Sequence, residues 1–554
     1  MKHFSSLLRP FYPTSVFLLS VFICTTVHAQ SLKGSEVFDQ AALNGIRTEE
    51  GFRRCERFVT AWLAYADPIS KLIPRNLDQD RDLWNAKDCG ADNYPFMVLT
   101  SFFTHRERFD GLMNQMLRNE ERLTSRVGAL PDDYSFSKKD FLHPEINMGR
   151  IVFGSAEYIK DGLMPLTEWI GRSPWSERML GILDELNRQI VVADDPEYSI
   201  TVKTEVNGEL LQVLSRVYWM TGDSKYLDWA EKIGDYFLLG EGYPLKAVEV
   251  MRLRDHGCEL ISGLCELYAT LHFVNPEKKQ RYQEPLYRLL DHILAFGRNE
   301  DGFFYNAYNS ITGDVIDRGV SDSWGYNLNG YYTVFLVDGT EKYRDAILKI
   351  FGNLHKYRQF DWERGSADGY ADAIESALNL YNRIPDERVA DWIDSEIDVM
   401  WSMQDSSHRE NAHKWVRSGV IEGWHGDGNF ARTTIMYNLW KTKGVYTDHF
   451  IEGLKIGGEI QGNSLYLVLQ APEKKWRGKI LFDKSRHKTV MNMPLDWPRI
   501  NQFPEWYTVD PDRTYRLTDE RGKNLDVVKG ASLIEGIEFQ LKAGERKRLI
   551  ISPL

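Results

Sequence analysis

The feature that most constrains this chain is a recurring loop, rich in glycine, acidic or aromatic residues, that runs each time into an apolar helical stretch. Five strong copies and two weaker ones lie near residues 92, 157, 206, 257, 326, 370 and 428. These intervals are close to the length of two helices with their connections and too long for a short solenoid repeat. The pattern predicts six or seven helical hairpins closed into an (α/α) toroid, with an open α-solenoid or a large bundle as alternatives. A closed ring would bring all these loops to one end.

The segment from about residue 49 to 447 reads as consecutive helices. Apolar residues recur at steps of three and four, as in Leu260, Leu264, Leu267 and Leu271, which is typical of helices with one buried face. After about residue 450, short alternating or β-branched runs at 463–470, 478–482, 488–493, 514–517, 536–541 and 548–551 predict strands. We therefore expect a mainly α chain with a toroid at 30–449 and a C-terminal antiparallel β-sandwich at 450–554.

The N-terminus has the pattern of a secretory signal peptide. Lys2 and Arg9 precede a short apolar run at 16–23, and the tripeptide Val-His-Ala at 27–29 resembles a signal-peptidase site. This predicts a signal peptide over 1–29, cleavage after Ala29 and a periplasmic or extracellular protein. The apolar run is too short for a stable membrane anchor, and no other stretch predicts a membrane span. The formal net charge of -12 argues against a nucleic-acid partner.

The cysteines do not form a disulfide scaffold. After loss of Cys24, only Cys55, Cys89, Cys258 and Cys265 remain in a long chain. Cys258 and Cys265 would lie about 10 Å apart along one helix, which is too far for a disulfide. We expect buried free thiols, and leave a bridge between Cys55 and Cys89 open.

The segment 365–375 (GSADGYADAIE) is the first candidate for chemistry. Asp368 lies between small residues in a tight loop, Tyr370 follows it, and Asp372 and Glu375 share a helical face. Carboxylates at a helix N-terminus are also common as caps, so capping is the alternative for Asp368 and Asp372.

The segment 422–432 (EGWHGDGNFAR) is the second candidate. Its three glycines permit close approach of a ligand. The side chains suit a sugar site: Trp424 could stack on a ring, His425 could move a proton, and Asp427 or Asn429 could bond hydroxyls. Glu422 adds a carboxylate at the start of the loop.

The segment 252–259 (RLRDHGCE) is the third candidate and supplies a cationic cluster in an acidic protein. Arg252 and Arg254 suit a carboxylate or sulfate of a substrate, and His256 could move a proton. The alternative is a loop in which Asp255 and Glu259 neutralise the arginines. Asp92, Trp324 and Tyr326 would complete the rim of the site.

The sequence predicts no cofactor. It contains no nucleotide-binding motif, HExxH pair or paired CxxC, and His256 and His425 lack sequence neighbours that would complete a zinc site. A structural calcium ion held by carboxylates is left open.

The motifs at 365–372 and 422–432 look like those of secreted bacterial proteins of polysaccharide-degradation systems. The whole layout resembles the secreted (α/α)-toroid enzymes of glycan breakdown, which include polysaccharide lyases acting on uronic acids, ulvan-type oligosaccharide dehydratases and unsaturated glucuronyl hydrolases. The resemblance covers nearly all of the mature chain, although the motifs match no defined catalytic signature. It implies a poly- or oligosaccharide substrate and leaves the reaction open.

Two reactions follow from these residues. In β-elimination on an anionic uronic acid, by a lyase or 4,5-dehydratase, Arg252, Arg254 or Asn429 would neutralise the carboxylate. His256, His425, Tyr326 or Tyr370 would move protons. In hydrolysis, Asp368 would pair with Asp427 or Glu422 across a glycosidic bond. Elimination is the expected reaction, hydrolysis is the alternative, and a non-catalytic glycan-binding protein is a third reading. The oligomeric state is left open.

Overall fold

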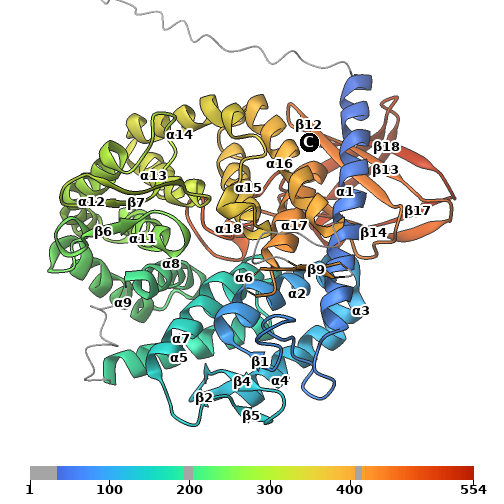
Figure 1. Cartoon of the computed structure of the whole chain (residues 1–554). Coiled ribbons are helices and arrows are strands. Elements are labelled where there is room, and N and C mark those ends of the chain that lie inside the picture. Colours follow the sequence, from blue (N-terminus) through green and yellow to red (C-terminus); the bar gives the residue numbers. More distant parts are fainter. Residues whose placement is uncertain (1–33, 193–203, 406–414, 418, 424) are drawn as a thin grey trace, which may run out of the picture.

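The computed structural model describes residues 34–192, 204–405, 415–417, 419–423 and 425–554. The predicted signal peptide and Trp424 lie outside these residues. Figure 1 shows a helical part, in which the chain runs from blue to orange, and strands in the red C-terminal part beside α1. None of the helices in the described ranges is long and apolar enough to cross a membrane.

Seven helical segments form the inner wall of the helical part. Burial explains their composition: every residue of α17 and most residues of α2, α11 and α15 are buried. The inner segments are α2 (Tyr94–Thr104), α5 (Met148–Glu157) continued by η3 (Tyr158–Leu163) and α6 (Met164–Ile170), α8 (Thr204–Thr221), α11 (Glu259–Val274), α13 (Trp324–Asp338), α15 (Ala367–Tyr381) and α17 (Asn429–Thr442).

Each inner segment is preceded in the chain by an outer helix with one apolar face. In α12, for example, the buried residues Tyr282, Leu286, Leu289, Leu290 and Ile293 follow the three- and four-residue steps of a single face. The outer helices are α1 (Gly34–Leu63), α4 (Asn114–Thr124), α7 (Pro174–Val192), α9 (Ser224–Gly234), α12 (Pro276–Phe296), α14 (Glu341–Asn353) and α16 (Glu387–Asp405).

The inner segments close into a ring. Contacts run from α2 to η3 and α6, from α5 and η3 to α8, and then through α11, α13, α15 and α17 back to α2. The described residues thus form seven helix pairs in a closed (α/α) toroid, which confirms the predicted fold class and selects seven over six. Six of the seven predicted joins lie at or near the N-terminal end of an inner segment, whereas the join near residue 157 lies inside one, where α5 passes into η3.

Short elements precede several inner helices and shape the end of the ring where the loops lie. They include three small antiparallel sheets: β1-β4-β5, β6-β7-β8 and β9-β10. Their strands are β1 (Leu83–Trp84), β4 (Tyr134–Ser135), β5 (Asp140–Phe141), β6 (Val250–Arg252), β7 (Tyr305–Asn309), β8 (Val315–Val320), β9 (Trp415–Arg417) and β10 (Val420–Glu422). A further hairpin joins β2 (Ser125–Val127) to β3 (Leu130–Pro131).

Helical turns make up the remaining short elements. They are η1 (Ala86–Asn93), α3 (Arg106–Arg108), η2 (Phe109–Met113), η4 (Asp235–Leu239), α10 (Pro244–Ala247), η5 (Asp255–Cys258), η6 (Leu354–Tyr357), η7 (Trp362–Arg364), α18 (Arg486–Thr489) and α19 (Gly530–Glu535).

The C-terminal part is a sandwich of two antiparallel sheets, as predicted. One sheet has the order β12-β13-β18-β15-β16 and the other β11-β14-β17. One buried cluster joins them, with Leu467 and Leu517 from the first sheet and Ile480 and Phe482 from the second. The strands are β11 (Val445–Thr447), β12 (Lys455–Gln461), β13 (Ser464–Gln470), β14 (Trp476–Phe482), β15 (Thr514–Asp519), β16 (Asn524–Lys529), β17 (Ile537–Leu541) and β18 (Arg546–Pro553).

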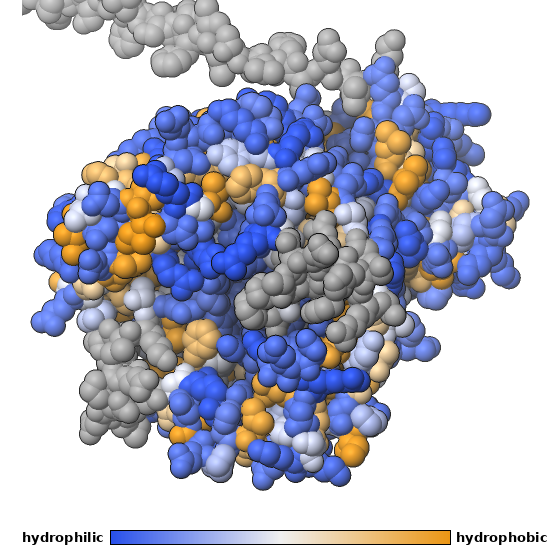
Figure 2. Space-filling model, viewed as in Figure 1, coloured by the Kyte–Doolittle hydropathy of each residue, from blue (hydrophilic) through white to orange (hydrophobic). Residues whose placement is uncertain are grey.

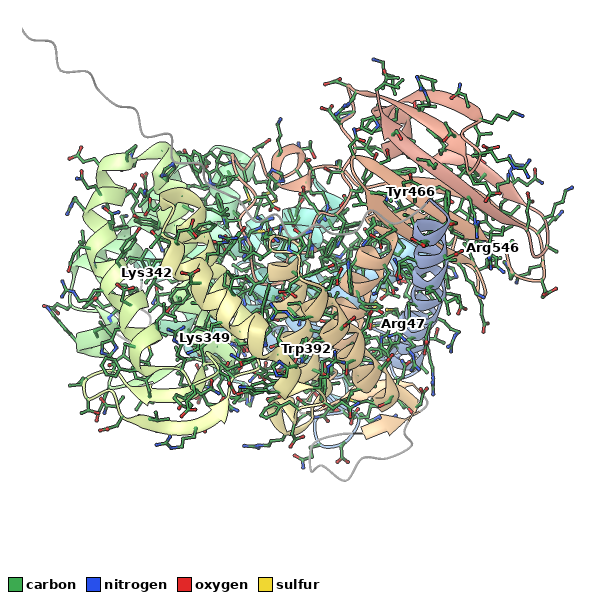
Figure 3. The ribbon with its side chains drawn as sticks, turned by 90° about the horizontal axis from the view of Figure 1, so that it is seen from above. Arg47, Lys342, Lys349, Trp392, Tyr466 and Arg546 are labelled. Atoms are coloured by element: carbon green, nitrogen blue, oxygen red, sulfur yellow. The ribbon has the colours of Figure 1, made fainter. Side chains whose placement is uncertain are left out.

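The sandwich lies against one side of the ring. Strand β12 packs along α1, and Phe38 of α1 contacts Tyr466 of β13 edge to face. Figure 3 shows the sandwich, with Tyr466 and Arg546, next to α1 with Arg47, while Lys342 lies on the far side of the ring. The domain boundary near residue 450 stays a prediction.

The expected strand at 488–493 is wrong. The chain instead makes the helical turn α18 and then crosses to the toroid before it returns at β15. Met491, Met493, Trp497 and Phe503 are buried in the apolar core of the toroid. The apolar residues that suggested a strand thus have their partners in the other part of the molecule.

The four cysteines of the described part are buried free thiols, as predicted. Burial raises the pKa of each of them.

Candidate active site

A cavity of about 160 Å³ lies at the N-terminal ends of the inner helices. On the face of the molecule seen in Figure 2, the surface is mostly hydrophilic and its apolar side chains form small separate groups. The cavity is lined by Lys87, Asp88, Asp92, Phe153, Glu157, Lys160, Asp161, Asp255, His256, Glu259, Ser323, Tyr326, Asp368, Asp372, His425, Asn429, Arg432, Ile500 and Asn501.

Acidic groups dominate this lining, and most of its basic groups are already paired. Lys160 contacts Asp161 at 2.7 Å and Glu259 at 2.5 Å, and the side chain of Lys160 is only 2% exposed. Arg432, His256 and His425 also face carboxylates. A strongly anionic ligand would therefore meet repulsion over much of the wall.

Arg432, on the first turn of α17, is the centre of a buried polar network. Its Nη2 lies 2.7 Å from Asp372 Oδ1 and its Nε lies 2.9 Å from Glu375 Oε2. The Tyr326 hydroxyl oxygen lies 2.9 Å from Asp372 Oδ1 and 2.9 Å from Glu375 Oε2. Burial raises the pKa of Asp372 to about 6 and that of Glu375 to about 7, although Arg432 acts in the opposite direction.

The same arginine positions Asn429 and, through it, Asp368. Arg432 Nη1 donates to Asn429 Oδ1 at 2.8 Å, and Asn429 Nδ2 donates to Asp368 Oδ1 at 2.7 Å. Asp368 stands in the first turn of α15, where the hydroxyl of Ser366 accepts from the Gly369 backbone as the N-cap. The helix thus takes its cap from Ser366, and Asp368 faces the cavity.

Asp88 and Asp92 lie on the π-helical turn η1, beside His425. The His425 Nε2 atom is 3.8 Å from Asp88 Oδ1 and 3.7 Å from Asp92 Oδ2. Asp88 also accepts from Arg75 Nε and Asn85 Nδ2, both at 2.5 Å. The charges of His425 and Arg75 lower the pKa of Asp88 against the effect of burial.

Asp92 behaves in the opposite way. Burial, together with the charges of Asp161, Glu157 and Asp368, raises its pKa well above the usual range. Asp88 and Asp92 raise the pKa of His425 to about 9 even though burial acts in the other direction. At neutral pH Asp88 is therefore ionised and His425 is positively charged, while the carboxyl group of Asp92 keeps its proton to a higher pH than an ordinary aspartate does.

The floor of the cavity comes from the long connection between β14 and β15. Asn501 Nδ2 donates to Asp161 Oδ1 at 2.5 Å, its Oδ1 accepts from Arg432 Nη1 at 2.8 Å, and its backbone N–H donates to Glu375 at 2.6 Å. Its φ of +61° lies in the left-handed region, where asparagine is favoured among non-glycine residues. Ile500 precedes it and also lines the cavity.

The structure brings six of the predicted site residues together along this cavity: Asp92, His256, Tyr326, Asp368, His425 and Asn429. Tyr370, Glu422 and Asp427 are buried nearby without lining it. Burial and the charge of Asp368 raise the pKa of Asp427 to about 8.

The other predicted residues lie elsewhere. Trp324 is fully buried and packs against Phe303 and Trp392 in the core. Arg252 pairs with Asp255 at 2.8 Å and lines a second cavity of about 470 Å³. Arg254 is half-buried and lines neither of these two cavities.

Sequence reasoning gave no role to Lys160, Asp161, Ile500 or Asn501. The weak join near residue 157 was the signal for the first two, because it marks the point where α5 passes into η3, which carries Lys160 and Asp161. Nothing in the sequence connects residues 500 and 501 with the toroid.

No protein-family model and no curated protein sequence matches the chain. Among solved structures, the GH76A α-1,6-mannanase from Salegentibacter sp. HEL1_6 is 10% identical over 58% of this chain and 96% of that chain, with a TM-score of 0.40. An unsaturated glucuronyl hydrolase from Bacillus sp. GL1 is 12% identical over 52% and 85%, with a TM-score of 0.34. A cellobiose 2-epimerase from Spirochaeta thermophila DSM 6192 is 14% identical over 72% and 96%, with a TM-score of 0.36. These similarities agree with the expected resemblance to toroid enzymes of glycan breakdown, but such low scores carry no argument about substrate or reaction.

Proposed function

We propose that this protein is an exported carbohydrate-active enzyme that hydrolyses a glycosidic bond by general acid–base catalysis. The observation that carries this proposal is the divergence of Asp88 and Asp92. These two carboxyl groups share one histidine, and their surroundings move their pKa values in opposite directions. Such divergence separates a proton donor from an ionised neighbour at a single pH.

Asp92 is the proposed acid. Its raised pKa lets it keep a proton to a higher pH than Asp88, it lines the cavity, and its side chain is 21% exposed. Asp88 is fixed by Arg75 and Asn85, so it supplies charge and does not react. In this role Asp92 would protonate the glycosidic oxygen as the bond to the leaving sugar breaks.

Asp368 is the proposed base or nucleophile. Asn429 holds its Oδ1 atom, so that one carboxylate face stays directed to the cavity. Hydrolysis needs a second carboxylate of this kind, either to activate water or to attack the anomeric carbon. The sequence suggested Asp368 with Asp427 or Glu422 as its partner, and we propose Asp92 as the partner instead.

The wall of the cavity favours a substrate rich in hydroxyl groups. Carboxylates accept hydrogen bonds from hydroxyls, while Asn429, Asn501 and Ser323 both donate and accept. Because the wall is acidic, we propose a neutral or weakly charged oligosaccharide or polysaccharide.

Elimination from a uronic acid is the second candidate, and the charge of His425 favours it. A protonated His425 at the cavity wall could neutralise the substrate carboxylate. Elimination also needs a side chain that accepts the substrate proton, and this requirement is not well met. Burial raises the pKa of the Tyr326 hydroxyl well above its usual range, so this tyrosine stays protonated and cannot accept the substrate proton near neutral pH.

The test is to incubate the mature protein with neutral and uronic-acid oligosaccharides and to follow new reducing ends and absorbance near 235 nm. Asp92→Asn should lower kcat by about 10²–10⁴-fold. It should lose much less on aryl glycosides whose leaving groups need no proton. Asp345→Asn, an exposed change on α14, is the matched control. If the absorbance near 235 nm rises together with product formation, the reaction is elimination and the proposed hydrolysis is wrong.

A further inference from the structure

Four side chains from three separate elements converge where the active-site cavity meets the second cavity. Glu157 ends α5, Glu205 and Glu209 lie one turn apart on α8, and His256 lies in η5. One ligand atom from each lies within 4.8 Å of the other three. His256 Nδ1 is 3.0 Å from both Glu157 Oε1 and Glu205 Oε1, and 4.0 Å from Glu209 Oε1.

Glu209 distinguishes this cluster from an ordinary ion pair. Its side chain is 0% exposed, and among the described residues neither of its carboxylate oxygens has a hydrogen-bond partner. One Nδ1–H group cannot satisfy three carboxylates. A buried carboxylate without a partner is strongly destabilising, and a cation bound between these side chains would remove that cost.

The other nitrogen of His256 is arranged as in known metal sites. Its Nε2 atom lies 3.3 Å from Asp255 Oδ1. Asp255 is itself held, because its backbone N–H donates to Ser323 Oγ at 3.1 Å and its carboxylate contacts Arg252 at 2.8 Å. A carboxylate behind a histidine fixes the tautomer and the ring orientation that a metal needs.

We propose that this cluster binds one divalent first-row transition-metal ion through four side chains: Glu157, Glu205, Glu209 and His256. Metal–ligand distances of about 2.0–2.2 Å separate the ligand atoms of a tetrahedral site by about 3.3–3.6 Å, so the most widely spaced side chains of this cluster would move together by about 1 Å. An imidazole among carboxylates suits Mn²⁺ or Zn²⁺ better than Ca²⁺, which prefers oxygen ligands. This site does not depend on the proposed hydrolysis.

Two other groups of similar composition provide internal controls. In the group Asp88, Asp92 and His425, the carboxylate of Asp88 already accepts from Arg75 and Asn85. The third group lies in the connection before β15, where arginines already bind its aspartate: His487, Asp496 and Glu505. Each group contains one histidine, so the same substitution can be made in all three.

The experiment titrates the EDTA-treated mature protein with Mn²⁺ and measures free ion by electron paramagnetic resonance. We expect one tight site per chain. Its affinity should fall at least 10-fold in Glu209→Gln and His256→Gln and stay within about twofold in His425→Gln and His487→Gln. In the wild-type protein with Mn²⁺ bound, electron spin echo modulation should show a coupled imidazole nitrogen.

The spectroscopic signal tests the site even where a variant folds poorly, since it is read on the wild-type protein. Absence of tight Mn²⁺ binding, absence of the nitrogen coupling, or equal loss of affinity in all three histidine variants would overturn the proposal. Tight binding of Ca²⁺ with exclusion of Mn²⁺ would also overturn it. Hydrolysis assays play no part in these outcomes, so failure of one proposal is distinguishable from failure of the other.

Discussion

Replacing Arg432 by methionine tests how the centre of the site is held together. The Arg432 side chain is 4% exposed, while that of Asp372 is 18% exposed and that of Glu375 is 0% exposed. Methionine fills much of the same volume and removes the charge, so two carboxylates lose their cation. Breaking a buried ion pair in this way costs about 3–5 kcal/mol, and we expect that loss in the free energy of unfolding at pH 7.5.

The pH dependence of the loss is a sharper test than its size. In the wild-type protein the pKa of Asp372 is about 6 and that of Glu375 about 7, both above their usual values. Without Arg432 both rise further. The native variant then binds protons that the unfolded chain releases, so its stability increases as the pH falls below these values. The loss at pH 5.5 should be about half of that at pH 7.5 or less.

The assay is urea unfolding followed by tryptophan fluorescence at pH 7.5 and 5.5. Arg477→Met is the matched control, because Arg477 is 77% exposed and lies 3.7 Å from Glu538. A surface pair of this kind contributes less than about 1 kcal/mol. A loss of less than about 1 kcal/mol in Arg432→Met, or a loss at pH 5.5 that equals or exceeds the loss at pH 7.5, would show that Arg432 does not hold these carboxylates together.

Three further predictions concern packing, the cavity floor and the thiols. Gly208→Ala should destabilise the protein by about 1–3 kcal/mol, because a Cβ there would lie 2.4 Å from the Leu260 backbone nitrogen. Gly181→Ala is the control: a Cβ at Gly181 has no neighbour within 4 Å, so this change should be neutral or stabilising in the same urea assay. Asn501→Gly keeps the left-handed backbone but removes bonds to charged groups, so it should cost about 1.5–3 kcal/mol, whereas the same change at exposed Asn492, with φ of +55°, should be nearly neutral. In the folded protein, on average less than one thiol per molecule should react with a disulfide reagent, and all four buried thiols should react after unfolding. Fast reaction of these thiols in the folded protein would contradict their burial.

The ring could be predicted because its signals are local. Most inner helices begin at a glycine-rich or acidic loop, and the outer helices carry one apolar face, so these local patterns give the order of the elements. Two residues of the candidate site could be predicted for the same reason. Asp368 and Asn429 stand in the first turns of their helices, and closing the ring brings them within hydrogen-bond distance.

Other parts of the site required the three-dimensional structure. Trp324 and Asp92 both lie where a loop meets an inner helix. Trp324 is buried in the core, whereas Asp92 lines the cavity. The exact rotation of each helix decides between these outcomes, and a one-residue shift turns a helical side chain by about 100°. Arg252 and Arg254 seemed free to bind an anion, but Arg252 pairs with Asp255 and lines the second cavity, not the active-site cavity.

The connection at 483–513 gives a reason for the sandwich to be fused to the toroid. Two apolar cores form, one in each part, yet Asn501 from beyond the predicted boundary at 450 links Asp161, Glu375 and Arg432. These residues come from three different inner segments. A chain truncated after residue 449 would therefore retain every helix of the ring and still lose the floor of its cavity. The sandwich is thereby a structural part of the site, and changes in its long connection should alter the cavity as directly as changes in the ring.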